Sequence, residues 1–117
     1  MMLLPSHIRV YLALGATDMR NEINGLSMLV EGTLALDVFS GHLFVLCNRR
    51  RTTMKILFWD RNGFAFYQKR LEKDRFKWPE SREEVMQVTG RELSFLLEGL
   101  DLTSIHPHRE LRYTTLI

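Results

Sequence analysis

The densest apolar pattern in the chain lies between residues 41 and 79. Three short runs there are rich in aromatic and β-branched residues: Leu-Phe-Val-Leu-Cys from Leu43, Met-Lys-Ile-Leu-Phe-Trp from Met54, and Phe-Ala-Phe-Tyr from Phe64. Polar, turn-forming residues separate the runs, which is typical of consecutive β-strands. The pattern predicts a three-stranded antiparallel meander at the centre of the fold.

The second turn of this meander is predicted at residues 60–63, because the Asn-Gly pair at its end tolerates the positive φ that tight hairpins require. If Asn-Gly forms a two-residue loop, Trp59 lies opposite Phe66. If the loop has three residues and the glycine is its left-handed bulge residue, Trp59 lies opposite Ala65. Both versions join antiparallel strands.

A strand and a helix are predicted before the meander. Residues 8–14 alternate loosely and indicate the strand. Thr17 and Asp18 offer N-cap chemistry for a helix that would end at Gly32. Gly25, in mid-helix, costs stability relative to alanine and is expected to allow a close approach to the sheet. The apolar stripe of this helix, at helical spacing, is Met19, Ile23, Leu26 and Val30.

A second strand and helix are predicted after the meander. Beyond Pro79, Val85–Val88 indicates a short strand, and Thr89-Gly-Arg-Glu92 has the spacing of a capping box at the start of a helix. Gly99 falls near the end of that helix. Its expected buried stripe is Leu93, Leu96, Leu97 and Leu100.

The run Leu43–Cys47 is apolar on both faces, so both faces of its strand should be covered. With only two helices predicted, either the sheet curls on itself or a partner completes one face. The expected fold class is α+β: a mainly antiparallel sheet built on the central three-stranded meander, with two helices. The 117 residues are expected to form a single domain, 1–117, with 101–117 as a loosely attached tail.

Charge is segregated along the chain. Residues 49–77 contain ten basic and three acidic residues, a net charge of +7, whereas the rest contains six basic and eleven acidic residues. A basic band interleaved with aromatic residues is typical of a surface that contacts phosphates and stacks on bases. Alternatively, the aromatics are core and the charges keep the sheet edges soluble. The candidate nucleic-acid-binding residues are Arg49, Arg50, Arg51, Lys55, Arg61, Lys69, Arg70, Lys73, Arg75 and Lys77.

Composition points to a cytoplasmic protein. The longest uninterrupted apolar run, Leu43–Cys47, is far too short to span a membrane. The opening Met-Met-Leu-Leu-Pro lacks the basic and hydrophobic regions of a signal peptide. The single cysteine, Cys47, rules out an internal disulfide and fits a reducing compartment, where it is expected to be an inert buried thiol.

The carboxylates offer weak candidates for chemistry. Asp18 and Glu22 have the spacing of a metal-binding pair, but capping and the helix dipole already explain acids there. Asp37, Asp60 and Glu72 could form a triad for metal-dependent phosphoryl transfer, yet spacing alone supplies no geometry. The histidines match no zinc pattern, and no glycine-rich phosphate loop occurs. The sequence therefore predicts a non-enzyme without catalytic residues, metal site or cofactor.

Several sequence blocks carry a family resemblance in this order: Gly15-Ala-Thr-Asp-Met-Arg20 with Gly25-Leu26, Phe39-Ser-Gly-His-Leu-Phe-Val45, Arg49-Arg50, Lys55-Ile-Leu-Phe-Trp-Asp60, Gly63, Lys69-Arg-Leu-Glu72, Arg75-Phe76, Trp78-Pro79, and Leu93, Leu96-Leu97 and Gly99. Together they resemble the small accessory proteins, called TnpB, of bacterial insertion-sequence family sixty-six. The RNA-guided nuclease of the same name is unrelated. One departure is Asp74, which stands where the family typically has glycine and puts the turn before Arg75 in doubt.

The resemblance implies a protein needed for transposition of its element and encoded beside a separate, larger transposase that carries the strand-transfer acids. It implies no catalytic residues in this chain. Two hypotheses follow. In the first, the protein binds DNA at the element ends through the basic band at 49–77. In the second, it is an interaction protein whose meander docks onto the transposase or a second copy of itself, without binding DNA directly.

Overall fold

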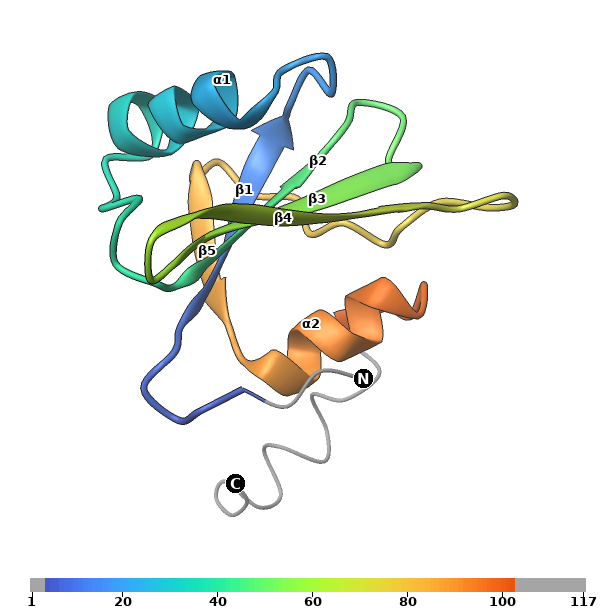
Figure 1. Cartoon of the computed structure of the whole chain (residues 1–117). Coiled ribbons are helices and arrows are strands. Elements are labelled where there is room, and N and C mark those ends of the chain that lie inside the picture. The colour runs from blue at the N-terminus through green and yellow to red at the C-terminus, as the bar shows by residue number, and fades with distance from the viewer. Residues whose placement is uncertain (1–3, 103–117) are drawn as a thin grey trace.

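The computed structural model describes residues 4–102, which form five strands and two helices (Figure 1). The strands are β1 (Val10–Ala16), β2 (Leu43–Cys47), β3 (Thr53–Asp60), β4 (Gly63–Arg70) and β5 (Val85–Val88). The helices are α1 (Ile23–Met28), which continues as the π-helical turn η1 (Leu29–Thr33), and α2 (Gly90–Leu97). The predicted α+β class is confirmed.

All five strands belong to one sheet, in the order β4-β3-β2-β1-β5. The pairs β2–β3 and β3–β4 are antiparallel, as the meander prediction requires, and β5 is antiparallel to β1. β1 and β2 are parallel, because the chain crosses one face of the sheet through α1 before it enters β2. This parallel pair brings the ends of β1 and β2, with the loops that follow them, to the same end of the sheet.

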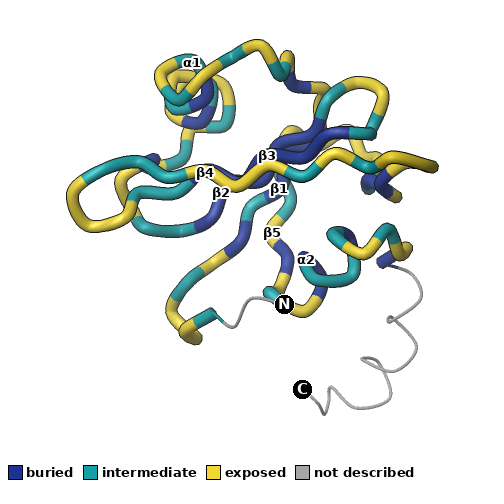
Figure 2. Tube along the Cα trace, turned by 45° about the vertical axis from the view of Figure 1, so that its right-hand side comes forward, coloured by how far each residue is buried: buried dark blue, intermediate teal, exposed yellow. Residues whose placement is uncertain are grey.

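Helices cover both faces of the sheet. On one face, α1 and η1 pack over a core that includes Leu26 and Phe44, and on the other, α2 packs over a core that includes Val45 and Leu93. The buried positions run through β1, β2 and β3 in the middle of the sheet (Figure 2). The two apolar faces of β2 are thus buried by the protein's own helices, and neither a curled sheet nor a partner is needed there.

The first helix begins later than the sequence predicted. It starts at Ile23, and its N-cap residue makes no side-chain capping hydrogen bond. Thr17 is buried instead, and its N–H donates to the carbonyl of Cys47 at 2.9 Å. The carboxylate of Asp18 is bound by Arg20. The expectation that Thr17 or Asp18 caps this helix is therefore wrong, because the β1–β2 pairing keeps the chain at the sheet for longer.

The expected roles of two glycines are also wrong. A Cβ added at Gly25 would lie 2.6 Å from Oδ1 of Asn21, so this glycine makes room for a side chain of the preceding loop rather than for the sheet. Gly32 lies within η1 instead of ending the helix. There the N–H of Leu34 donates to the carbonyl of Leu29 at 3.1 Å, five residues earlier, which is the hydrogen bond of a π-turn.

The β3–β4 hairpin has a two-residue loop formed by Arg61 and Asn62, and Trp59 pairs with Phe64. The predicted antiparallel turn is confirmed, but both predicted registers are wrong. Arg61 adopts a φ of 58° and supplies the left-handed conformation that the prediction assigned to glycine. Gly63 is consequently the first residue of β4.

The predicted capping box of α2 is confirmed. The N–H of Glu92 donates to Oγ1 of Thr89 at 3.0 Å, and the N–H of Thr89 donates to the Glu92 carboxylate at 2.8 Å. We expect Thr89→Ala to lower the free energy of unfolding by about 1 kcal/mol, because the first turn loses its hydrogen-bond acceptor. Urea denaturation measures this, with Thr89→Ser as the control. Equal losses in both variants would show that the hydroxyl is not the stabilising group.

The stripe predicted for α2 extends one residue too far. Leu93 and Leu96 are fully buried, but Leu100 is 43% exposed, beyond the left-handed Gly99 (φ 81°) that follows the helix. No helix within residues 4–102 has the length and hydrophobicity to cross a bilayer. Beyond residue 102, the expected tail lies outside the described residues.

Candidate nucleic-acid interface

The ten basic candidates divide between the two ends of the sheet. The β2–β3 turn and the end of β4 lie at one end, because Thr53 pairs with Arg70 and the N–H of Leu71 donates to the carbonyl of Thr52 at 2.8 Å (Figure 1). The β3–β4 loop, which contains Arg61, lies at the opposite end, separated by the eight residues of β4. Arg61 is therefore not part of a continuous surface with the other candidates.

Asn48 shapes the β2–β3 turn. Its Oδ1 accepts hydrogen bonds from the N–H groups of Thr52 and Thr53 at 2.8 and 3.1 Å, and its Nδ2 donates to Oγ1 of Thr52 at 3.1 Å. These contacts hold the turn closed from inside, as Asn side chains commonly do. Arg49 and Arg50, in the middle of the turn, are left exposed.

Arg51 points back toward the sheet rather than into solvent. Its guanidinium donates to the carbonyl of Leu14 at 3.0 Å and to that of Asn48 at 3.3 Å. It also lies 5.8 Å from the ring centroid of Trp78, within the range of a cation–π contact. The side chain thus joins the turn to β1 and to the segment after β4, which gives it a structural role within the fold.

Lys55 is only 3% exposed. Its Nζ donates to the carbonyls of Met19 and Asn21, both at 3.1 Å, and lies 5.2 Å from the ring centroid of Phe66. A buried ammonium needs such partners, because an unpaired charge in the interior is costly. Lys55 therefore tethers the loop between β1 and α1, and its ammonium group lies inside the fold and not on the exposed surface.

Lys69 is likewise used within the fold. Its Nζ donates to the carbonyl of Leu97, the last residue of α2, at 2.6 Å. A cation at this end of a helix satisfies an orphan carbonyl and complements the helix dipole. Lys69 therefore fixes α2 against β4.

The remaining candidates lie in or beside an arm, residues 70–77, that runs along the β2–β3 turn. The N–H of Phe76 donates to the carbonyl of Arg51 at 2.7 Å and fastens the arm to the turn. Asp74, which raised doubt about this turn, adopts a φ of 67°, a left-handed conformation that favours glycine. We call the exposed cations gathered here the basic end; they are Arg49, Arg50, Arg70, Lys73, Arg75 and Lys77.

The basic end has cations that the fold does not use. Within residues 4–102, none of its six side chains makes a hydrogen bond, an ion pair or a ring contact. Two exposed acids, Glu72 and Asp74, lie among them, so the cations remain in excess. Adjacent like charges repel one another, a cost that a polyanion would relieve.

Sequence reasoning missed Arg20 as a neighbour of this surface. Arg20, Arg49 and Arg50 line one pocket of about 660 Å³, together with residues 16–19 and Asn48. The parallel β1–β2 pair places the two loops side by side, and no local sequence pattern indicates that pairing. Arg20 is exposed, with its guanidinium on the carboxylate of Asp18 at 2.6 Å. The guanidinium and the backbone N–H of Arg20 donate hydrogen bonds to this carboxylate, which lowers the pKa of Asp18 to about 2.

Most of the aromatic residues expected to stack on bases are not available for it. Phe76 and Trp78 are buried, 2% and 7% exposed, and Nε1 of Trp78 donates to the carbonyl of Ala13 at 3.1 Å. Trp59 and Phe64 pack against each other and against Phe39 at the end of the sheet opposite the basic end. Among the aromatic residues of the 49–77 band, Phe66 and Tyr67 are the exposed ones, at 38% and 46%.

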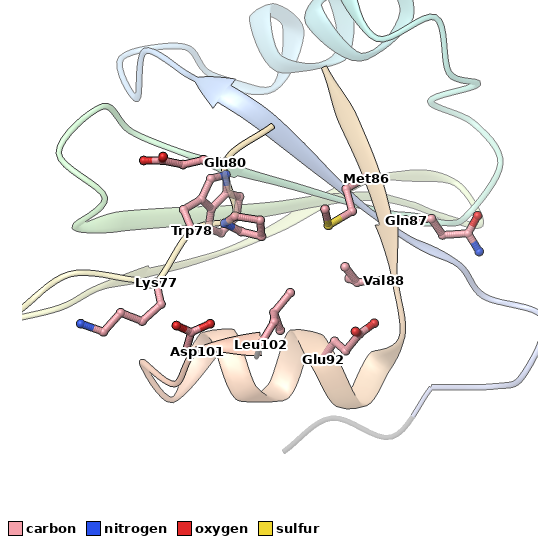
Figure 3. A pocket seen from close by; sticks show the side chains of 10 residues that line it. Lys77, Trp78, Glu80, Met86, Gln87, Val88, Glu92, Asp101 and Leu102 are labelled. Carbon is pink, nitrogen blue, oxygen red and sulfur yellow. The ribbon is translucent and has the colours of Figure 1, made fainter. Parts of the chain in front are cut away.

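A second pocket, of about 720 Å³, lies between β5, α2 and residues 77–80 (Figure 3). Met86 and Val88 point toward it from β5, and Trp78 lies on its other side. Its charged lining is acidic on balance, with one cation against Glu80, Glu92 and Asp101. A polyanion is therefore not expected here.

The carboxylates weighed for catalysis do not come together. Asp60 and Glu72 lie at opposite ends of β4, and Oδ1 of Asp37 accepts the N–H of Phe39 at 3.0 Å. No group of three or more His, Cys, Asp or Glu side chains among residues 4–102 has the arrangement of a metal site. Cys47 is buried, and that burial raises the pKa of its thiol, as expected of an inert cysteine.

Comparison with known proteins identifies the family. Residues 8–107 match the family model described as IS66 Orf2 like protein. An uncharacterized protein of Sinorhizobium fredii, y4hO, is 35% identical over 114 residues, which cover 96% of this chain and 97% of the relative. A second from the same organism, y4jC, is 31% identical over 98 residues, or 84% of each chain. No solved structure matches the chain significantly. The chain therefore belongs to the IS66 Orf2-like family, which links it to insertion-sequence transposition in an accessory role.

Proposed function

We propose that this protein is a non-catalytic accessory in transposition that binds DNA of its element through the basic end. The observation that supports this most strongly is that some of the cations make contacts within the fold and the others do not. Arg51, Lys55 and Lys69 are consumed by contacts within the fold, whereas the six cations of the basic end have no partner within residues 4–102. Solubility alone does not require exposed cations to gather on two adjoining segments.

The expected mode of binding is electrostatic. Each phosphate contact releases counterions and contributes about 0.9 to the slope of log K against log salt concentration. Six contacts would give a slope of about −5 at most. Because phosphate contacts fix position rather than read sequence, preference for the element ends should be modest for the protein alone. The scarcity of exposed aromatics on the basic end favours contact with the DNA backbone over base stacking.

The test is a binding titration of the purified protein, without the transposase, against a labelled duplex of the element end and a scrambled duplex. Fluorescence anisotropy across a salt series gives the affinity and the slope. We expect both duplexes to bind with a steep slope. No binding of either duplex at protein concentrations up to about 100 μM, the weak limit for non-specific contacts at physiological salt, would reject the proposal.

A second candidate function is docking onto the transposase or onto a second copy of the chain. The observation that favours it is β4, an edge strand whose outer side pairs with no other strand of the sheet within residues 4–102. Phe66 and Tyr67, near its middle, are 38% and 46% exposed. Such an edge can accept a further strand from a partner.

Gln68→Pro tests the docking candidate. In a hairpin whose two-residue loop spans Arg61 and Asn62, Gln68 occupies a pair whose N–H faces away from β3, so proline removes an outward donor and spares the β3–β4 ladder. If β4 is a docking edge, the variant should lose capture of the tagged transposase by about tenfold or more and keep its DNA affinity. Undiminished capture by the folded variant would exclude docking through this edge.

A further inference from the structure

Hydrogen bonds from the core fix the position of the β1–α1 loop, which forms one wall of the pocket beside the β2–β3 turn. The N–H of Thr17 donates to the carbonyl of Cys47 at 2.9 Å and fastens the start of the loop to β2. Nζ of Lys55 donates to the carbonyls of Met19 and Asn21, the two residues that flank Arg20. One buried lysine thus holds both sides of the position that carries the arginine.

The pocket combines three cations with one anion. Arg20, Arg49 and Arg50 are exposed on its lining, and the carboxylate of Asp18 lies among them. Nε of Arg20 contacts both carboxylate oxygens at 3.0 and 3.1 Å, and Nη2 contacts Oδ2 at 2.6 Å. A guanidinium has five N–H donors, so Arg20 keeps donors for a second anion. The volume, about 660 Å³, accommodates a phosphodiester with its flanking sugars.

We propose that Arg20 binds a DNA phosphate in this pocket, next to the separate phosphates that Arg49 and Arg50 contact at its rim, with Asp18 as an internal anion that competes for Arg20. The assignment rests on the proposed function and adds to it a defined phosphate position outside the 49–77 band. Lys55 is a positioning residue here, because it holds the loop that carries Arg20 and does not touch the ligand.

Because Asp18 competes with DNA for Arg20, the direction in which its substitution changes DNA affinity tests the proposal. Its pKa of about 2 keeps the carboxylate ionised at any pH used for binding, so substitution rather than acidification removes the charge. Asp18→Asn frees Arg20 and removes a repulsion, and should tighten binding of a duplex roughly fivefold at 0.1 M salt. If Asp18 only shaped the loop, the same variant would weaken binding or leave it unchanged.

Two further variants complete the test. Arg20→Ala should weaken binding roughly eightfold at 0.1 M salt and lower the salt slope by about 0.9, as expected for one lost phosphate contact. Lys55→Met should give a similar loss, and the double variant should bind no more weakly than Arg20→Ala alone, because both changes remove the same contact. Thermal melts of each variant check that it is folded.

Asp37→Asn is the control, since it removes one negative charge from the loop that packs on Trp59 at the opposite end of the sheet. It should change affinity less than twofold, whereas an effect equal to that of Asp18→Asn would overturn the pocket assignment. If Arg49 and Arg50 prove necessary for binding but Arg20→Ala and Asp18→Asn have no effect, the pocket is rejected and DNA binding stands. If none of the four residues affects binding and substitution of Arg70, Lys73, Arg75 and Lys77 likewise leaves binding unchanged, the proposed function itself is rejected.

Discussion

Replacing Arg49 and Arg50 together with serine is expected to weaken DNA binding roughly sixtyfold at 0.1 M salt and to flatten the salt slope by about 1.8, as two lost phosphate contacts require. The change should leave the free energy of unfolding within about 0.5 kcal/mol of wild type, because both side chains are exposed and bind nothing within residues 4–102. Anisotropy titrations across a salt series and urea denaturation measure the two quantities.

The matched control removes two positive charges from the other end of the sheet. Arg9 precedes β1, and Arg61 lies in the β3–β4 loop; both are exposed. Arg9→Ser with Arg61→Asn changes the net charge equally, and asparagine tolerates the left-handed φ of Arg61. This control should leave the slope nearly unchanged. Equal losses in the two double variants would mean that net charge, and not the basic end, governs binding.

Arg51 is the next residue along the chain, but Arg51→Ala is expected to reduce stability and to leave the salt dependence of DNA binding unchanged. The free energy of unfolding should fall by about 2–3 kcal/mol, because charge-assisted hydrogen bonds to the carbonyls of Leu14 and Asn48 and the contact with Trp78 are lost. The salt slope should remain that of wild type, since Arg51 is not proposed to contact DNA. Urea denaturation and a salt series on the folded variant measure both.

Arg50→Ala serves as the comparison for stability, and should unfold at the wild-type urea concentration. If Arg51→Ala is as stable as Arg50→Ala, the contacts of Arg51 contribute nothing to the fold. If it flattens the slope by about 0.9, Arg51 binds a phosphate after all. Replacing all three arginines of the turn at once would mix a loss of binding with a loss of stability.

The sequence predicted correctly those elements that depend on interactions between residues close together in the chain. The meander and the capping box of α2 follow from apolar runs and from side chains three residues apart, and both appear as expected. The exact hairpin register did not follow, because Arg61, which no propensity favours for φ > 0, takes the left-handed position beside a glycine that does not need it. A single turn residue was enough to shift both predicted pairings.

Contacts between residues that are far apart in the sequence could not be predicted. Lys55, Lys69 and Arg51 read as members of a charged band, but their acceptors lie 36, 28 and 37 residues away, at Met19, Leu97 and Leu14. Sequence spacing cannot show such contacts. The parallel pairing of β1 with β2, which adds Arg20 to the candidate site, was hidden for the same reason.

Mapping backbone amide shifts in the NMR spectrum of the labelled protein during titration with a duplex shows whether DNA lies on the basic end of the sheet. This placement of the DNA predicts the largest shifts at residues 18–20, 48–52 and 70–77, and unchanged amides at the β3–β4 loop around Arg61. Shifts concentrated at that loop or along α2, with none at Arg49 and Arg50, would contradict it.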